Sequence, residues 1–136
     1  MALGNPENEV VFRRSVDAWN ADDWEKLESL WNPDGHIVAP EGWPEPGRRE
    51  GWVAIRKQFD RIKESWTEEH AEVLDIRSAG DLLFARLRWV MRGEASGAPL
   101  EVDMWMLCAF DDGLFTSIEY FLDRDAAMAA AEGIER

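Results

Sequence analysis

Several residue types and patterns are scarce in this 136-residue sequence. Cysteine occurs only at Cys108, which excludes an intramolecular disulfide and leaves a cysteine-based zinc site without ligands. No apolar run approaches the roughly 20 residues that cross a bilayer, and the opening MALGNPENEV does not resemble a signal peptide. Basic residues number 15 against 28 acidic ones, so the formal charge is −13. This charge disfavours nucleic acid and anionic membranes as partners, and we expect a cytoplasmic protein.

Tryptophan is abundant by contrast, with eight residues in the chain. The composition is otherwise ordinary for a globular protein, with 46% apolar and 32% charged residues, and the length predicts a single domain over residues 1–136. A buried indole N–H needs a hydrogen-bond partner. Eight tryptophans therefore predict a large aromatic core, a cavity, or both.

Hydrophobic periodicity predicts the order of helices and strands. Apolar residues spaced by three and four predict a helix that is capped by Asn8 and reaches Trp19, a short one starting at Asp22 or Asp23, and a third over 52–66. Alternating patterns predict strands over 36–39, 70–77, 82–92, 100–110 and 114–122, with loops over 40–47 and 93–99. Asp123 caps a final short helix over 124–131. This order predicts an α+β fold in which a curved antiparallel sheet wraps around three main helices.

Strand alternation also predicts which side chains face the helices. On the strand over 82–92, Leu87 and Trp89 belong to an entirely apolar set. Pairing Phe110 with Phe115 in the hairpin then defines one inward face. The predicted inward residues of this hairpin include Asp103, Trp105, Leu107, Ile118 and Tyr120.

The opposite face of the same hairpin is too apolar to be left in water. We therefore expect a second copy of the chain to cover it, giving a homodimer through the convex sheet face. The residues that predict this interface are Val102, Met104, Met106, Cys108, Phe110, Phe115 and Phe121.

Short motifs along nearly the whole chain follow one order. They include Ala18–Trp19–Asn20, Arg49–Glu50–Gly51, Gly80–Asp81 and Asp112–Gly113. Together they resemble the SnoaL-like polyketide cyclase family of the nuclear transport factor 2-like superfamily. The resemblance implies a cone with a pocket inside and frequent dimerisation through the convex face. It does not fix the chemistry, because the superfamily includes several enzyme classes and proteins without activity.

Three residues are candidates for proton chemistry. An aspartate among apolar walls has a raised pKa, so Asp103 would move a proton while Tyr120 holds an oxyanion. His36, near the cone mouth if the resemblance holds, would shuttle protons. The ordinary alternatives are a carboxylate in water at the cone rim, a core tyrosine and a surface histidine. Glu72 is either inward-facing or part of a salt bridge at a strand end.

Cavity-lining residues are the candidates for ligand binding. Trp43 lies in a loop rich in proline and glycine and is either a lid over the pocket or an edge-packing residue. The sequence has no metal-ligand spacing and no phosphate-binding loop, so we expect no cofactor and no metal. The predicted ligand-binding residues are Trp19, Trp43, Leu87, Trp89, Trp105, Leu107 and Ile118.

Three functions follow from these residues. The first is a cofactor-independent cyclase, isomerase or dehydratase that acts on a small apolar substrate. The second is a non-catalytic carrier of a small apolar ligand. The third is a homodimerisation module whose cavity is filled by tryptophan side chains.

Overall fold

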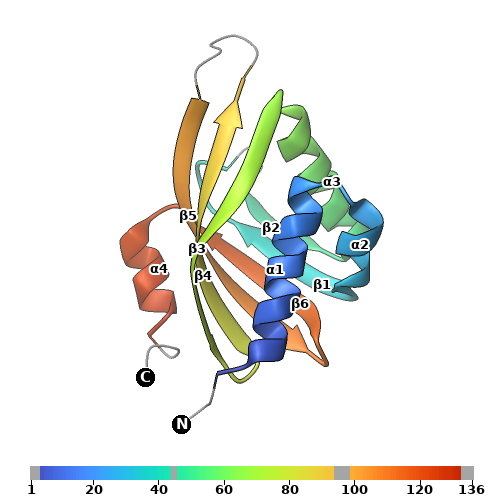
Figure 1. The fold of residues 1–136 in the computed structure, drawn as a ribbon, viewed down its shortest axis with the longest axis vertical. Coiled ribbons are helices and arrows are strands. Elements are labelled where there is room, and N and C mark those ends of the chain that lie inside the picture. The colour runs from blue at the N-terminus through green and yellow to red at the C-terminus, as the bar shows by residue number, and fades with distance from the viewer. Residues whose placement is uncertain (1–3, 44–45, 94–98, 133–136) are drawn as a thin grey trace.

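The computed structural model describes residues 4–43, 46–93 and 99–132, and it confirms the α+β prediction. A curved sheet wraps around α1, α2 and α3, while α4 lies on the other side of the sheet (Figure 1). Residues 44–45 and 94–98 of the two predicted loops lie outside the described residues. In chain order the elements are α1 (Pro6–Asn20), α2 (Trp24–Ser29), β1 (Trp31–Ala39), β2 (Gly47–Glu50), α3 (Trp52–Glu64), β3 (Glu68–Ala79), β4 (Leu82–Arg92), β5 (Pro99–Asp111), β6 (Leu114–Phe121) and α4 (Arg124–Ala130).

Side-chain caps fix where the helices begin. Asp23 accepts a hydrogen bond from the amide of Lys26 at 3.1 Å, so Asp23 and not Asp22 caps α2. Asp123 accepts one from the amide of Ala126 at 2.9 Å, which confirms the predicted cap of α4. The cap of α1 is Asn5 and not Asn8. Asn8 is instead 4% exposed inside the helix.

The six strands among the described residues lie in the order β2-β1-β6-β5-β4-β3, with β1 parallel to β6 and the other pairs antiparallel. Residues 32–35 form an irregularity inside β1, where the Asn32 side chain accepts a hydrogen bond from the amide of Asp34 at 2.9 Å. Sequence patterning missed β2. Its residues, GRRE, carry no apolar alternation and pair with β1 along one edge of the sheet.

A register shift in the hairpin corrects the predicted faces of β5. Phe110 pairs with Phe115 as expected, but Ala109 pairs with Ser117, so one extra residue stands in β6. Because side chains alternate along a strand, this bulge reverses the predicted inward and outward faces of β5. The residues of β5 that face the helices are Met104, Met106, Cys108 and Phe110, all at most 7% exposed.

The apolar face that predicted a dimer is therefore inside the cone. Five of its seven residues belong to the main core, namely Met104, Met106, Cys108, Phe110 and Phe115. On the outer face, Phe84 and Trp105 pack against Ala127 on α4 and Ala131 just after it, and Phe121 packs against the same group. Phe121 is thus the one residue of the predicted interface that packs against the group around α4.

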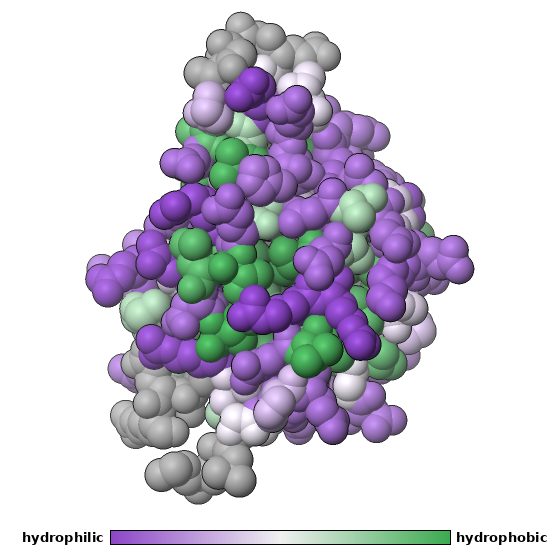
Figure 2. Space-filling model, viewed as in Figure 1, coloured by the Kyte–Doolittle hydropathy of each residue, from purple (hydrophilic) through white to green (hydrophobic). Residues whose placement is uncertain are grey.

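The surface carries the charge of the protein. On the face in Figure 2, hydrophilic residues separate small apolar patches. None of the described helices is long and apolar enough to cross a membrane.

Candidate functional site: an aromatic cavity in the cone

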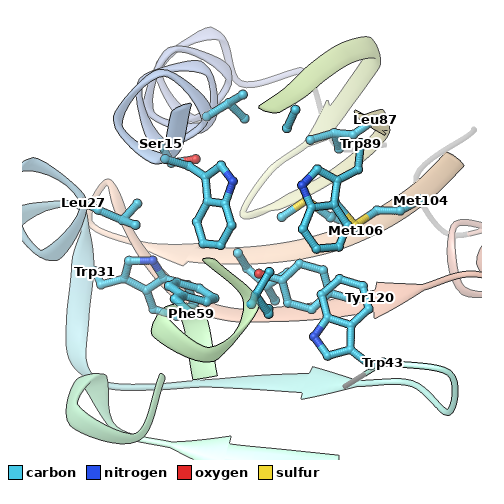
Figure 3. A pocket seen from close by; sticks show the side chains of 15 residues that line it. Ser15, Leu27, Trp31, Trp43, Phe59, Leu87, Trp89, Met104, Met106 and Tyr120 are labelled. Carbon is cyan, nitrogen blue, oxygen red and sulfur yellow. The ribbon is translucent and has the colours of Figure 1, made fainter. Parts of the chain in front are cut away.

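A cavity of about 70 Å³ lies between the concave face of the sheet and the helices. Figure 3 shows aromatic rings gathered around this space, with Trp31 and Phe59 on one side and Trp89, Tyr120 and Trp43 on the other. The lining is almost entirely apolar. It comprises Ser15, Val16, Trp19, Leu27, Trp31, Trp43, Phe59, Ile62, Ala71, Leu87, Trp89, Met104, Met106, Ile118 and Tyr120.

The cavity wall contains six of the residues predicted from the sequence. They come from α1, the loop before β2, β4 and β6, so four separate segments converge on one space. Their place in the wall agrees with the prediction, while their contact with a ligand stays a prediction. These six residues are Trp19, Trp43, Leu87, Trp89, Ile118 and Tyr120.

Four other predicted site residues lie outside the cavity, which corrects their assignment. Trp105 and Leu107 belong to the outer face of β5 because of the bulge and pack with Phe84. His36 lies on the outer face of β1 and lines a separate surface groove together with Leu107 and Glu119.

Asp103 is also on the outer face, where its carboxylate is 36% exposed and bonded to Arg86 at 2.7 Å. Arg88 lies 3.6 Å from its other oxygen. The hydrogen bond from Arg86 and the charges of both arginines lower the pKa of Asp103, against the predicted increase. An ionised surface carboxylate outside the cavity cannot serve as the base of a reaction inside it.

We expect Asp103→Asn to change stability by less than about 1 kcal/mol, because exposed ion pairs contribute little. The folded-state pKa is below the unfolded value of 3.8. The stabilisation is thus present above that value and is lost as the pH falls through the lowered pKa. Urea unfolding at pH 7 and pH 3 measures the difference, and a loss of several kcal/mol at pH 7 would contradict the surface assignment.

Tyr120 provides the clearest polar group of the wall. It is 7% exposed, and within the described chain its hydroxyl has no hydrogen-bond partner. Burial raises the pKa of Tyr120, so the hydroxyl stays protonated and available to donate to a ligand. It is the only titratable group among the described lining residues, and no carboxylate, histidine or cysteine accompanies it there.

Trp43 closes part of the cavity with its ring. The ring centroid lies 5.7 Å from that of Trp89 and 5.1 Å from that of Tyr120, and Trp43 is 7% exposed. Its Nε1 is buried without a hydrogen-bond partner among the described residues, which costs about 1–3 kcal/mol. Trp43 thus fills space beside Trp89 and Tyr120, although its Nε1 then lies buried as an unpaired donor.

Trp43→Ala should enlarge the cavity and strengthen the binding of benzene. The present volume is about half of the ~150 Å³ that holds benzene in an engineered apolar cavity. Benzene titrations followed by proton NMR should show at least about tenfold tighter binding to the variant than to the unaltered protein, whose smaller cavity accommodates the ring less well. Trp66→Ala, which removes a tryptophan outside the wall, is the control. Equal benzene binding by both variants would contradict the assigned position of Trp43.

A buried carboxylate that sequence reasoning missed holds two of the wall tryptophans. The side chain of Glu69, on β3, is 6% exposed. Its Oε1 accepts hydrogen bonds from the indole nitrogens of Trp19 at 2.5 Å and Trp89 at 3.0 Å. Its Oε2 accepts from Lys63 Nζ at 2.6 Å. This one side chain therefore ties together α1, α3, β3 and β4 beside the cavity.

The predicted strand over 70–77 began too late to include Glu69. In the structure, Glu69 and Ala71 share the face that looks toward the helices, while Glu72 is half exposed and pairs with His70 at 3.2 Å. The alternation Glu69, Ala71, Val73 is the signal that could have identified this face. It ends at a register shift between Val73 and Asp75, after which Ile76 packs against the core.

Among the described residues, no group of three His, Cys, Asp or Glu side chains is arranged to hold a metal ion. Cys108 is fully buried, and burial raises the pKa of its thiol. The arrangement is suited to binding an apolar molecule against aromatic rings, with one hydroxyl to orient it.

Comparisons with known proteins identify relatives that share this fold. The model of the SnoaL-like domain family matches residues 12–118. IdmH, a putative polyketide cyclase from Streptomyces antibioticus, has a similar structure, with a TM-score of 0.78, 22% identity, and 93% of this chain and 99% of IdmH covered. TerC, crystallised with polyporic acid, gives a TM-score of 0.78 at 19% identity, covering 90% of this chain and 96% of TerC.

An NTF2-like protein of unknown function from Burkholderia pseudomallei gives a TM-score of 0.77 at 14% identity, covering 96% of this chain and 98% of that one. None of the curated proteins matches the chain. These likenesses confirm the predicted nuclear transport factor 2-like fold.

Proposed function

Because the chain belongs to the SnoaL-like domain family, we propose that its aromatic cavity binds a small, largely apolar molecule. The observation that carries this proposal is the cavity itself, which the wall residues leave open although tryptophan rings surround it. The presence of polyporic acid in crystals of TerC supports the use of such a cone for a small organic molecule. The Tyr120 hydroxyl would orient the ligand.

Binding without proton transfer fits the wall better than catalysis does. A cyclase, isomerase or dehydratase needs a base within hydrogen-bond reach of the proton that it removes. The described wall offers the protonated hydroxyl of Tyr120 and no base, because Asp103 and His36 lie on the outer face. We therefore favour the carrier over the enzyme.

Tryptophan fluorescence tests ligand binding directly. Chloroform, a compact apolar quencher of indole fluorescence, should quench part of the emission along a saturable curve. Trp89→Phe, which removes an indole from the wall, should reduce the saturable part, while Trp105→Phe, which removes one from the outer face, should leave it. Quenching that stays linear with chloroform concentration in all three proteins would refute the proposal.

Homodimerisation through the convex sheet face stays a prediction, and fewer residues support it. Most of the residues that suggested it lie inside the cone, and α4 covers Trp105 on the outer face. The support that remains is the family resemblance. Sedimentation at micromolar concentration measures the state directly, and a monomer would remove the dimerisation module from the three functions considered.

A further inference from the structure

Aromatic rings make up a large share of the cavity wall. Six of its fifteen lining residues are aromatic, and four of these are tryptophans. The face of an aromatic ring carries negative potential and attracts cations, and tryptophan does so most strongly. The described wall contains no lysine or arginine that would repel a cation.

Glu69 strengthens the attraction of the wall for cations, because it binds the indole N–H groups of Trp19 and Trp89. Both N–H groups donate to the same carboxylate oxygen, which is not part of the wall. The positive edges of the two rings are thus paired with an atom outside the cavity. Hydrogen bonds to a charged acceptor polarise the donor, so electron density moves toward the rings that line the cavity.

The charges beside these two rings add up to a negative value. Lys63 contacts Glu69 at 2.6 Å and Asp22 at 2.9 Å, so one ammonium faces two carboxylates. Lys63 Nζ also lies 4.3 Å from the ring centroid of Trp19, which shows that an ammonium already rests on an aromatic ring at this site. A ligand cation would therefore rely more on Trp89, Trp31 and Tyr120. The net charge of −13 raises the local concentration of cations.

The size of the cavity limits the ligand. At about 70 Å³ it has roughly half the volume that accepts the six carbons of benzene. A compact, roughly spherical group therefore matches this cavity better than a flat, extended ring system does. Methylated ammonium groups have this shape, and their weak hydration lowers the cost of entering an apolar space.

We infer that the cavity takes a compact methylated ammonium ion, or the methylated ammonium head of a larger molecule, and that Glu69 is a positioning residue for this recognition. The inference rests on the proposed function, because it names the class of ligand for the same cavity. It adds that charge, and not apolar surface alone, decides what binds.

A matched pair of ligands separates the inference from the proposed function. Tetramethylammonium and tert-butanol have the same number of non-hydrogen atoms and similar shapes, and only the first is charged. Titrations followed by NMR should show binding of tetramethylammonium at least about tenfold tighter than that of tert-butanol, or about 1.4 kcal/mol. Equal affinities, or tighter binding of tert-butanol, would overturn the inference and leave the proposed function intact. Binding of neither would contradict both.

Variants of the Glu69 group test the positioning role. Glu69→Gln keeps the shape and one acceptor but removes the charge, so tetramethylammonium affinity should fall by about tenfold while tert-butanol affinity changes little. Lys63→Gln should have the opposite effect on tetramethylammonium. Glu72→Gln, on the same strand but half exposed, is the control and should change neither affinity. Glu69 would be a structural residue only if Glu69→Gln lowered the affinity for both ligands equally, or if Lys63→Gln also lowered the affinity for tetramethylammonium.

Discussion

Met106→Glu is expected to cost about 4 kcal/mol of folding free energy, which corresponds to a fall in melting temperature of about 14 °C. Met106 is 7% exposed in the wall of the cavity, opposite Ala85 on β4 and Tyr120 on β6. A carboxylate at this position would lie among apolar and aromatic side chains without a charged partner. Thermal and urea unfolding measure the loss.

Leu107→Glu is the matched control for this variant. Leu107 is the next residue of β5, half buried on the outer face, and it lines the surface groove beside His36. A carboxylate there can reach water, so we expect a loss of less than about half that of Met106→Glu. If Leu107→Glu were the more damaging variant, the faces of β5 would be reversed and the cavity would have a different wall.

Glu69→Ala is expected to destabilise the protein by about 3 kcal/mol, because removing one partner of a buried charge pair leaves the others unsatisfied. The indole nitrogens of Trp19 and Trp89 lose their acceptor, and Lys63 loses one of its two carboxylate partners while it keeps the exposed Asp22 and the carbonyl oxygen of Trp19. The two wall tryptophans would also lose the contact that fixes their orientation. Urea unfolding measures the first effect, and the tryptophan bands of near-UV circular dichroism measure the second.

Glu72→Ala provides the comparison on the same strand. Glu72 is 49% exposed and contacts His70, so its removal should change stability by less than about 1 kcal/mol and leave the tryptophan bands unchanged. Similar effects of the two variants would mean that the Glu69 contacts contribute little in solution.

The helices and most strands could be predicted from the sequence because their periods are strong. The pattern that includes Phe59 and Ile62 identified α3, and acidic caps marked the starts of α2 and α4. On β4 the apolar alternation also gave the correct face, so Leu87 and Trp89 were assigned to the wall from sequence alone.

Faces downstream of a bulge could not be predicted in this way. The extra residue in β6 near Thr116 leaves no mark in the hydrophobic pattern, because β5 is apolar on both faces. As a result, Asp103 was placed inside and Met106 outside, and the catalytic and dimer predictions followed from that error. Contacts between distant segments could not be predicted either, since the hydrogen bonds of Glu69 join it to tryptophans 50 and 20 residues away.

The methionine methyl groups offer the most direct test of ligand binding in the cone. Met104 and Met106 line the cavity, while Met128 lies on α4 at the outer face. With methyl-¹³C methionine, titration with tetramethylammonium and with tert-butanol should shift the Met104 and Met106 signals along saturable curves for at least one ligand, and leave Met128 in place. Shifts confined to Met128, or the absence of saturable shifts with either ligand, would contradict a small-molecule site inside the cone.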